Sequence, residues 1–171
     1  MSVGTRREAR ERALALLYEA EAKDMSPSLL LDQLPVPPDP FAAELVRGVG
    51  EQGGRLDAII AGRAIGWTLS RMPAVDRNLL RLATYELCER PDIPTAVVIS
   101  EAVELAKRYS TEESGRFVNG LLAGVAGDVR PPPAAARGPG EPPGPAPVQP
   151  PAPPCVGQAP PRGAGPELGP I

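Results

Sequence analysis

The chain has 171 residues, with 18 Lys and Arg against 21 Asp and Glu, a formal net charge of −3 and no histidine. The lack of histidine excludes Ser–His and Cys–His nucleophilic catalysis and every metal site that needs an imidazole. The two cysteines, Cys88 and Cys155, form neither a C-x-x-C pair nor a disulfide framework, which suits a reducing compartment. No apolar run has the length of a signal peptide or membrane span, so we expect a soluble, cytoplasmic protein.

The composition changes abruptly after Arg130. Residues 131–171 include 16 Pro and 7 Gly, and only four of them are charged. A segment with so little apolar surface cannot offset the entropy lost on ordering it. We therefore expect one domain over residues 1–130 and a disordered Pro/Gly-rich tail over residues 131–171.

Apolar residues recur at helical spacing nearly throughout the first 130 residues, and no stretch alternates as a strand would. Gly53-Gly54 is expected to end one of the helices. Seven helices are expected in chain order, with a short turn or helix at 67–72: 6–23, 27–34, 40–53, 56–66, 74–89, 95–109 and 112–127. The sequence predicts an all-α fold in which about four N-terminal helices pack against about three C-terminal ones.

The segment from Gly48 to Gly53 reads G-x-G-x-x-G, the spacing of a dinucleotide-binding loop. That loop binds phosphate only between a strand and the N-terminus of a helix, whereas these glycines trail a helix. The C-terminus of a helix presents carbonyl groups, which repel phosphate. We interpret the segment as a helix end and a turn, without a cofactor.

Four carboxylates in the C-terminal half raise the question of an acid–base pair: Glu86, Glu89, Glu101 and Glu104. Nothing in the sequence directs them to a shared pocket, and no nucleophile motif accompanies them. They are more simply interpreted as solvated helix faces and ion pairs. We therefore expect no enzymatic activity and no metal.

The first helix separates its charges. At about 100° per residue, Arg6, Arg7 and Arg10 share a flank that ends in Tyr18, while Glu8 points elsewhere. Arginines can contact phosphates and a ring can stack on a base, so this flank is a candidate RNA-binding strip. A solvated basic N-terminus is the alternative.

The last helix carries the pair Arg116-Phe117. Phe117 shares one helix face with Leu121 and Val125, so the apolar pattern alone places its ring in the core. Arg116 is a second candidate phosphate donor.

A series of short segments matches one known family. The opening segment RREARERA (6–13) is followed by Leu17-Tyr18. The later segments are VDR (75–77), LRLA (80–83), YEL (85–87), IP (93–94), EAVELAK (101–107) and FVNG (117–120). In order and spacing they resemble the NusB family of transcription antitermination factors. The resemblance spans about residues 5–127, is thin between residues 24 and 65, and is absent from the tail.

The resemblance implies an all-helical fold of two small subdomains and a non-enzymatic role in transcription. With NusE, a protein of the small ribosomal subunit, such factors bind boxA RNA in nascent transcripts, notably of ribosomal RNA operons. They thereby help RNA polymerase, with other Nus factors, to resist termination. The RNA contacts that the resemblance implies fall on Arg6, Arg7, Arg10, Tyr18, Arg116 and Phe117.

Two further roles come from the resemblance alone. It moves Phe117 from the core toward a partly exposed stacking position, and it places Asp76 in the region that contacts NusE. Two positions depart from the family pattern. Glu8 stands where some relatives have a third arginine, so we expect weaker RNA binding. Ser100 stands where asparagine is common, which could alter a cap-like hydrogen bond.

Two other functions stay open at this point. The first is a NusB-like RNA-binding module of the kind that precedes rRNA cytosine methyltransferase domains, although no such domain follows here. The second is a helical scaffold that engages partners through its proline-rich tail, although the tail lacks flanking basic anchors. The sequence also leaves open whether the protein forms a homodimer.

Overall fold

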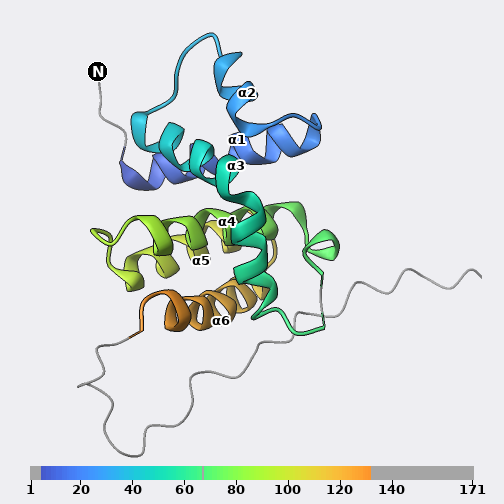
Figure 1. Ribbon diagram of the computed structural model, residues 1–171, viewed down its shortest axis with the longest axis vertical. Coiled ribbons are helices and arrows are strands. Elements are labelled where there is room, and N and C mark those ends of the chain that lie inside the picture. Colours follow the sequence, from blue (N-terminus) through green and yellow to red (C-terminus); the bar gives the residue numbers. More distant parts are fainter. Residues whose placement is uncertain (1–4, 67, 132–171) are drawn as a thin grey trace, which may run out of the picture.

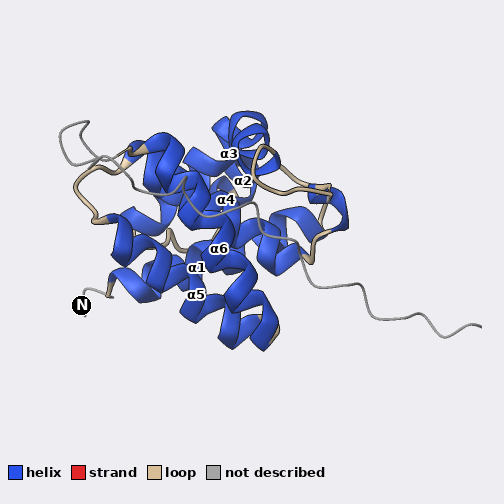
Figure 2. Ribbon diagram, turned by 90° about the horizontal axis from the view of Figure 1, so that it is seen from below, coloured by secondary structure: helices blue, strands red, loops and turns tan. Residues whose placement is uncertain are grey.

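The computed structural model describes residues 5–66 and 68–131. These residues form six α-helices and one 3-10 turn, and they contain no strand (Figure 2). The elements are α1 (Arg6–Ala22), α2 (Pro27–Asp32), α3 (Pro40–Ala61), η1 (Leu69–Arg71), α4 (Ala74–Glu89), α5 (Thr95–Tyr109) and α6 (Glu112–Val129). The all-α prediction is confirmed, whereas the predicted tail lies outside the described residues except for Pro131.

The helices form two groups that share α4. The first core packs α1, α2 and α3 together, and the second packs α4, α5 and α6. Leu82 and Tyr85 of α4 enter the first core, while Leu79 and Leu80 enter the second. Figure 1 shows α3 running from the layer of α1 and α2 down to the layer of α4–α6. The N-terminal and C-terminal helices therefore pack against each other along α4, as expected.

Side-chain caps explain where several helices begin. The Thr5 hydroxyl accepts from the Glu8 amide at 3.2 Å, and the Glu8 carboxylate accepts from the Thr5 amide at 2.6 Å. This reciprocal capping box satisfies amides that the first turn of α1 would otherwise leave unpaired. Ser26 and Asp39 cap α2 and α3, each followed by proline at the first helical position.

The predicted helix break at Gly53-Gly54 is wrong. A single helix, α3, runs through both glycines, so the expected helices 40–53 and 56–66 are one element and the count falls to six. Each glycine costs about 1 kcal/mol relative to alanine inside a helix, which packing can outweigh. Val49 and Leu56, on either side of the pair, are both buried in the first core. The G-x-G-x-x-G segment is therefore helical rather than a turn.

Gly48 has a packing role in α3. A Cβ atom at this position would lie 2.1 Å from the Tyr85 ring of α4, a distance that no real contact reaches. The glycine thus allows the backbone of α3 to approach the Tyr85 ring, where the two cores meet. Of the described helices, none combines the length and apolar character that crossing a membrane requires.

Candidate nucleic-acid interface

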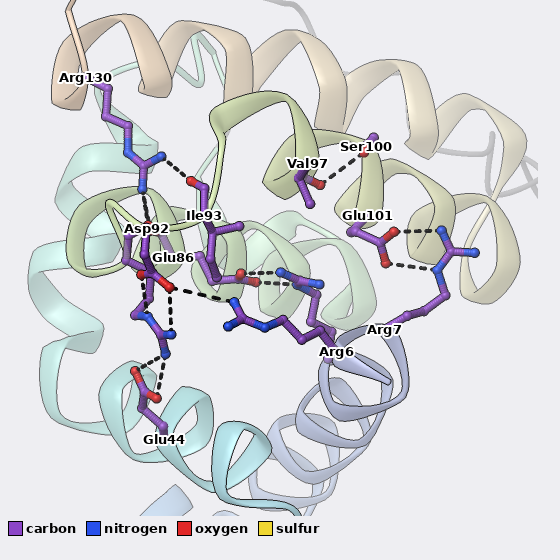
Figure 3. Close-up of polar contacts among 12 residues, drawn as sticks. Arg6, Arg7, Glu44, Glu86, Asp92, Ile93, Val97, Ser100, Glu101 and Arg130 are labelled. Carbon is purple, nitrogen blue, oxygen red and sulfur yellow. Dashed lines mark hydrogen bonds and ion pairs between the residues drawn. The ribbon is translucent and has the colours of Figure 1, made fainter. Parts of the chain in front are cut away.

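The predicted basic flank lies where α1 meets the α4–α5 connection and α5. Each of its three arginines points toward an acid: Arg6 toward Asp92, Arg7 toward Glu101 and Arg10 toward Glu86. Figure 3 shows Arg6 and Arg7 on α1 together with the acids Glu86, Asp92 and Glu101 at this junction. The three pairs differ in the exposure of the arginine: the side chains of Arg6 and Arg7 face solvent, and that of Arg10 does not.

Arg10 is buried, which corrects its prediction as a phosphate contact. Its side chain is 3% exposed, and its Nε and Nη2 donate to the two oxygens of Glu86 at 2.8 and 2.7 Å. Glu86 is 1% exposed, so of the two interpretations given for this carboxylate the ion pair is correct and the solvated helix face is wrong. The physical reason is that α4 places Glu86 opposite Arg10 inside the packed junction. Two buried charges need such pairing to offset the loss of water.

Arg7 forms an equally regular pair at the surface. Its side chain is 57% exposed, and its Nε and Nη2 donate to the carboxylate of Glu101 at 2.9 and 2.7 Å. The hydrogen bonds from Arg7 lower the pKa of Glu101 and, in turn, raise the pKa of Arg7. Arg7 therefore stays charged and solvent-facing.

Arg6 is held most loosely. Its Nη1 lies 3.8 Å from the Asp92 carboxylate, and its side chain is 59% exposed. Asp92 is itself bound by Arg90, whose Nε and Nη2 donate to it at 2.9 and 3.0 Å. These bonds lower the pKa of Asp92 to about 2. Arg90 also donates to Glu44 of α3, which ties the α4–α5 connection to the first core.

The aromatic ring of Phe41 contacts three arginines of this junction. The guanidinium carbons of Arg6, Arg10 and Arg90 lie 5.3, 5.5 and 5.2 Å from the centroid of its ring. Cation–π contacts of this kind stabilise a group of like charges that would otherwise repel one another. Neither Phe41 nor Arg90 was predicted to act at this junction, because both act through contacts with distant parts of the chain.

Tyr18 is half exposed, as its candidate role requires, and it follows Arg10 by about two turns of α1. It lines a cavity of about 590 Å³ between α1, the start of α4 and the end of α5. Val75 and Tyr109 line the same cavity, and the Tyr109 hydroxyl donates to Glu11 on α1. Tyr109 is a ring that the sequence interpretation missed.

The two candidate residues on α6, Arg116 and Phe117, differ in burial. Arg116 is exposed, consistent with its candidate role. Phe117 is 4% exposed and belongs to the core of α4, α5 and α6. The partly exposed stacking position that the resemblance implied for Phe117 is wrong, and the apolar pattern of α6 gave the correct position. A ring packed in this core cannot stack on a base unless α6 rearranges.

Asp76 is also buried, which corrects its prediction as a partner contact. Its side chain is 3% exposed and accepts a 2.8 Å hydrogen bond from the Ser114 hydroxyl of α6. The carboxylate stands in the first turn of α4, where the helix dipole favours it. Asp76 therefore joins α4 to α6 instead of facing a partner.

Two further residues have structural roles here. Ser100 donates to the carbonyl of Val97 at 3.1 Å within α5, so its hydroxyl is used locally (Figure 3). Arg130 donates to four carbonyls at the end of α4 and in the α4–α5 connection, those of Glu86, Leu87, Arg90 and Ile93, at 2.7–2.9 Å. Arg130 thus adds a side-chain donor to the carbonyls at the end of α4, of which those of Glu86 and Arg90 also accept from backbone amides.

The described residues define a class of protein: a small helical domain with an arginine-rich helix end at its surface. Within residues 5–66 and 68–131, no group of three or more His, Cys, Asp or Glu side chains could hold a metal. The charged groups at the α1 junction pair with one another.

Known proteins identify the family. The NusB family profile matches residues 7–127, and the chain belongs to this family. The chain is 50% identical over 128 residues to the transcription antitermination protein NusB of Salinispora arenicola (strain CNS-205), a match that covers 71% of this chain and 94% of that protein. The resemblance seen in the sequence is thereby confirmed, as is the expectation of a non-enzymatic protein.

Two solved structures share the fold. T. maritima NusB matches with a TM-score of 0.70 and 38% identity, covering 76% of this chain and 96% of its own. A chain from the crystal structure of antitermination factors NusB and NusE in complex with dsRNA matches with a TM-score of 0.60 and 28% identity. That match covers 72% of this chain and 96% of the other.

Proposed function

We propose that the protein is a cytoplasmic transcription antitermination factor that binds boxA RNA of nascent ribosomal RNA transcripts together with NusE. In this role it helps RNA polymerase, with other Nus factors, to resist termination. Two findings support the proposal: the relatives are named as antitermination proteins, and a NusB of the same fold occurs in a complex with NusE and RNA. They favour this function over that of a methyltransferase module or a scaffold.

The observation that carries the proposal is the exposure of Arg6 and Arg7 at the N-terminus of α1. Both guanidinium groups face solvent at one helix end, where the helix dipole adds partial positive charge. The Glu8 carboxylate is engaged with the Thr5 amide, so it does not pair with either arginine. We assign phosphate contacts to Arg6 and Arg7, with Tyr18 and Arg116 as outer contacts. We assign Arg10 a structural role, because its buried ion pair with Glu86 holds α1 against α4.

The test replaces Arg6 and Arg7 together by alanine and measures single-stranded boxA RNA binding at several salt concentrations. We expect weaker binding and a log–log salt slope that is flatter by about 1.4, because each single-strand phosphate contact contributes about 0.7. A matched control replaces Arg47 and Arg71, two exposed arginines on α3 and η1, and removes the same charge. Equal effects in the two variants would contradict the assignment.

The function itself is tested by transcription through a terminator downstream of boxA. We expect the wild-type protein, with NusE, to increase readthrough and the Arg6/Arg7 variant to lose most of that increase. No residue is assigned to the NusE surface, because Asp76 is buried. Failure of the wild-type protein to increase readthrough with NusE present would contradict the proposed function.

A further inference from the structure

Glu101 binds Arg7 in the geometry that a phosphate would use. Its two carboxylate oxygens accept from Nε and Nη2 of Arg7, a side-by-side pairing of two donors with two acceptors (Figure 3). The guanidinium fork recognises carboxylates and phosphates in this same bidentate way. The Nε and Nη2 donors of Arg7 that face Glu101 form a fork that also fits a phosphate.

We propose that Glu101 is an intramolecular phosphate mimic, and that RNA binds by exchanging one of its phosphates for this carboxylate on Arg7. The inference rests on the proposed role of Arg7 in RNA binding. Before RNA arrives, Glu101 holds the guanidinium of Arg7 in an ordered position. Once RNA binds, the carboxylate turns to solvent and the phosphate occupies the fork.

The burial of the pairs at this junction singles out Arg7 for exchange. Arg10 and Glu86 have the same bidentate geometry, but both are buried, so a phosphate cannot reach Arg10. Arg6 needs no exchange, because it lies 3.8 Å from Asp92, whose oxygens are already held by Arg90. Among these three arginines of α1, Arg7 combines a bidentate carboxylate partner with a largely exposed side chain. The guanidinium of Arg7 is the solvent-facing side of the pair, whereas the Glu101 side chain is 15% exposed and has to turn outward for the exchange.

A competing carboxylate lowers the affinity for RNA, because binding must first break the ion pair. Removing the charge of Glu101 should therefore tighten binding, even though it removes a contact that orders Arg7. A residue that only positioned Arg7 would give the opposite result when neutralised. The direction of the change thus separates a competitor from a positioning residue.

The experiment measures the dissociation constant of a labelled single-stranded boxA RNA by fluorescence anisotropy, with circular dichroism to confirm folding. Glu101→Gln is compared with Glu104→Gln, a matched control one turn further along α5. Glu104 is exposed and pairs with Lys107 at 3.2 Å, so its neutralisation removes the same charge without releasing Arg7. We expect Glu101→Gln to tighten binding about fivefold, the upper range for ion pairs whose arginine faces solvent, and clearly more than Glu104→Gln.

The decisive comparison repeats Glu101→Gln in the Arg7→Ala background. Without Arg7 there is no ion pair to break. In that background Glu101→Gln should change the dissociation constant for RNA no more than Glu104→Gln does. The exchange is wrong if Glu101→Gln weakens binding, if it equals Glu104→Gln, or if it keeps its full effect without Arg7. An Arg7→Ala variant that binds RNA normally would overturn the RNA interface itself, and the exchange with it.

Discussion

The buried centre and the exposed rim of the α1 junction contain the same ion pair in opposite surroundings. Arg10 and Glu86 in the centre, and Arg7 and Glu101 at the rim, each form two hydrogen bonds of 2.7–2.9 Å. The centre is closed to water, whereas the Arg7 side chain is largely exposed. The comparison teaches that burial, rather than hydrogen-bond geometry, separates an arginine that holds helices together from one whose guanidinium faces solvent.

The largest expected effect comes from breaking the central pair. Glu86→Ala leaves the Arg10 charge buried without its partner, which should lower the free energy of unfolding by about 3–5 kcal/mol. Chemical denaturation measures this change. Glu89→Ala is the control, because Glu89 lies on the same helix but is exposed. Similar losses in the two variants would show that the central pair has no special structural role.

A smaller loss of stability is expected at the other buried carboxylate. Asp76→Ala removes the acceptor of the Ser114 hydroxyl and should lower the free energy of unfolding by about 1–3 kcal/mol. RNA affinity should be unchanged as long as the variant is folded, because Asp76 lies inside the protein. A fully stable Asp76→Ala variant would mean that Asp76 does not join α4 to α6.

The sequence predicted the helices well because their signals are local. Caps such as Thr5 and Ser26, followed by apolar residues at helical spacing, specify the start of a helix within a few residues. The break predicted at Gly53-Gly54 failed because neighbouring residues of α3 are buried in the core by packing against other helices. Helix propensity describes the isolated segment, whereas packing against other helices decides whether the helix continues in the folded protein.

The candidate site was predicted less completely because burial depends on distant partners. The helical angles placed Arg10 on the same flank as Arg6 and Arg7, but only the fold brings Glu86, 76 positions away, against it. For Phe117, the apolar pattern of α6 was a better guide than the role taken from the resemblance. Asp76 was expected at the surface from the resemblance alone, and its buried partner Ser114 lies 38 positions further along the chain, beyond the reach of a local pattern.

The smallest effect is expected from removing the tail. We propose that residues 1–130 form the folded domain, and Arg130 belongs to it because it binds carbonyls at the end of α4. A chain that ends at Arg130 should therefore keep the melting temperature and helical content of the full chain, as thermal circular dichroism can show. A loss of several degrees would mean that the tail packs on the domain.

The most direct test of the difference between centre and rim compares RNA binding by two variants. Arg10→Met with Glu86→Leu replaces the buried pair with apolar side chains, an exchange that proteins often tolerate without loss of stability. We predict that this folded double variant keeps the wild-type dissociation constant for boxA RNA and the wild-type salt slope. Arg7→Ala should weaken binding and flatten the slope by about 0.7. The account is contradicted if the salt dependence of RNA binding becomes as much flatter in the double variant as in Arg7→Ala, because Arg10 would then contact RNA.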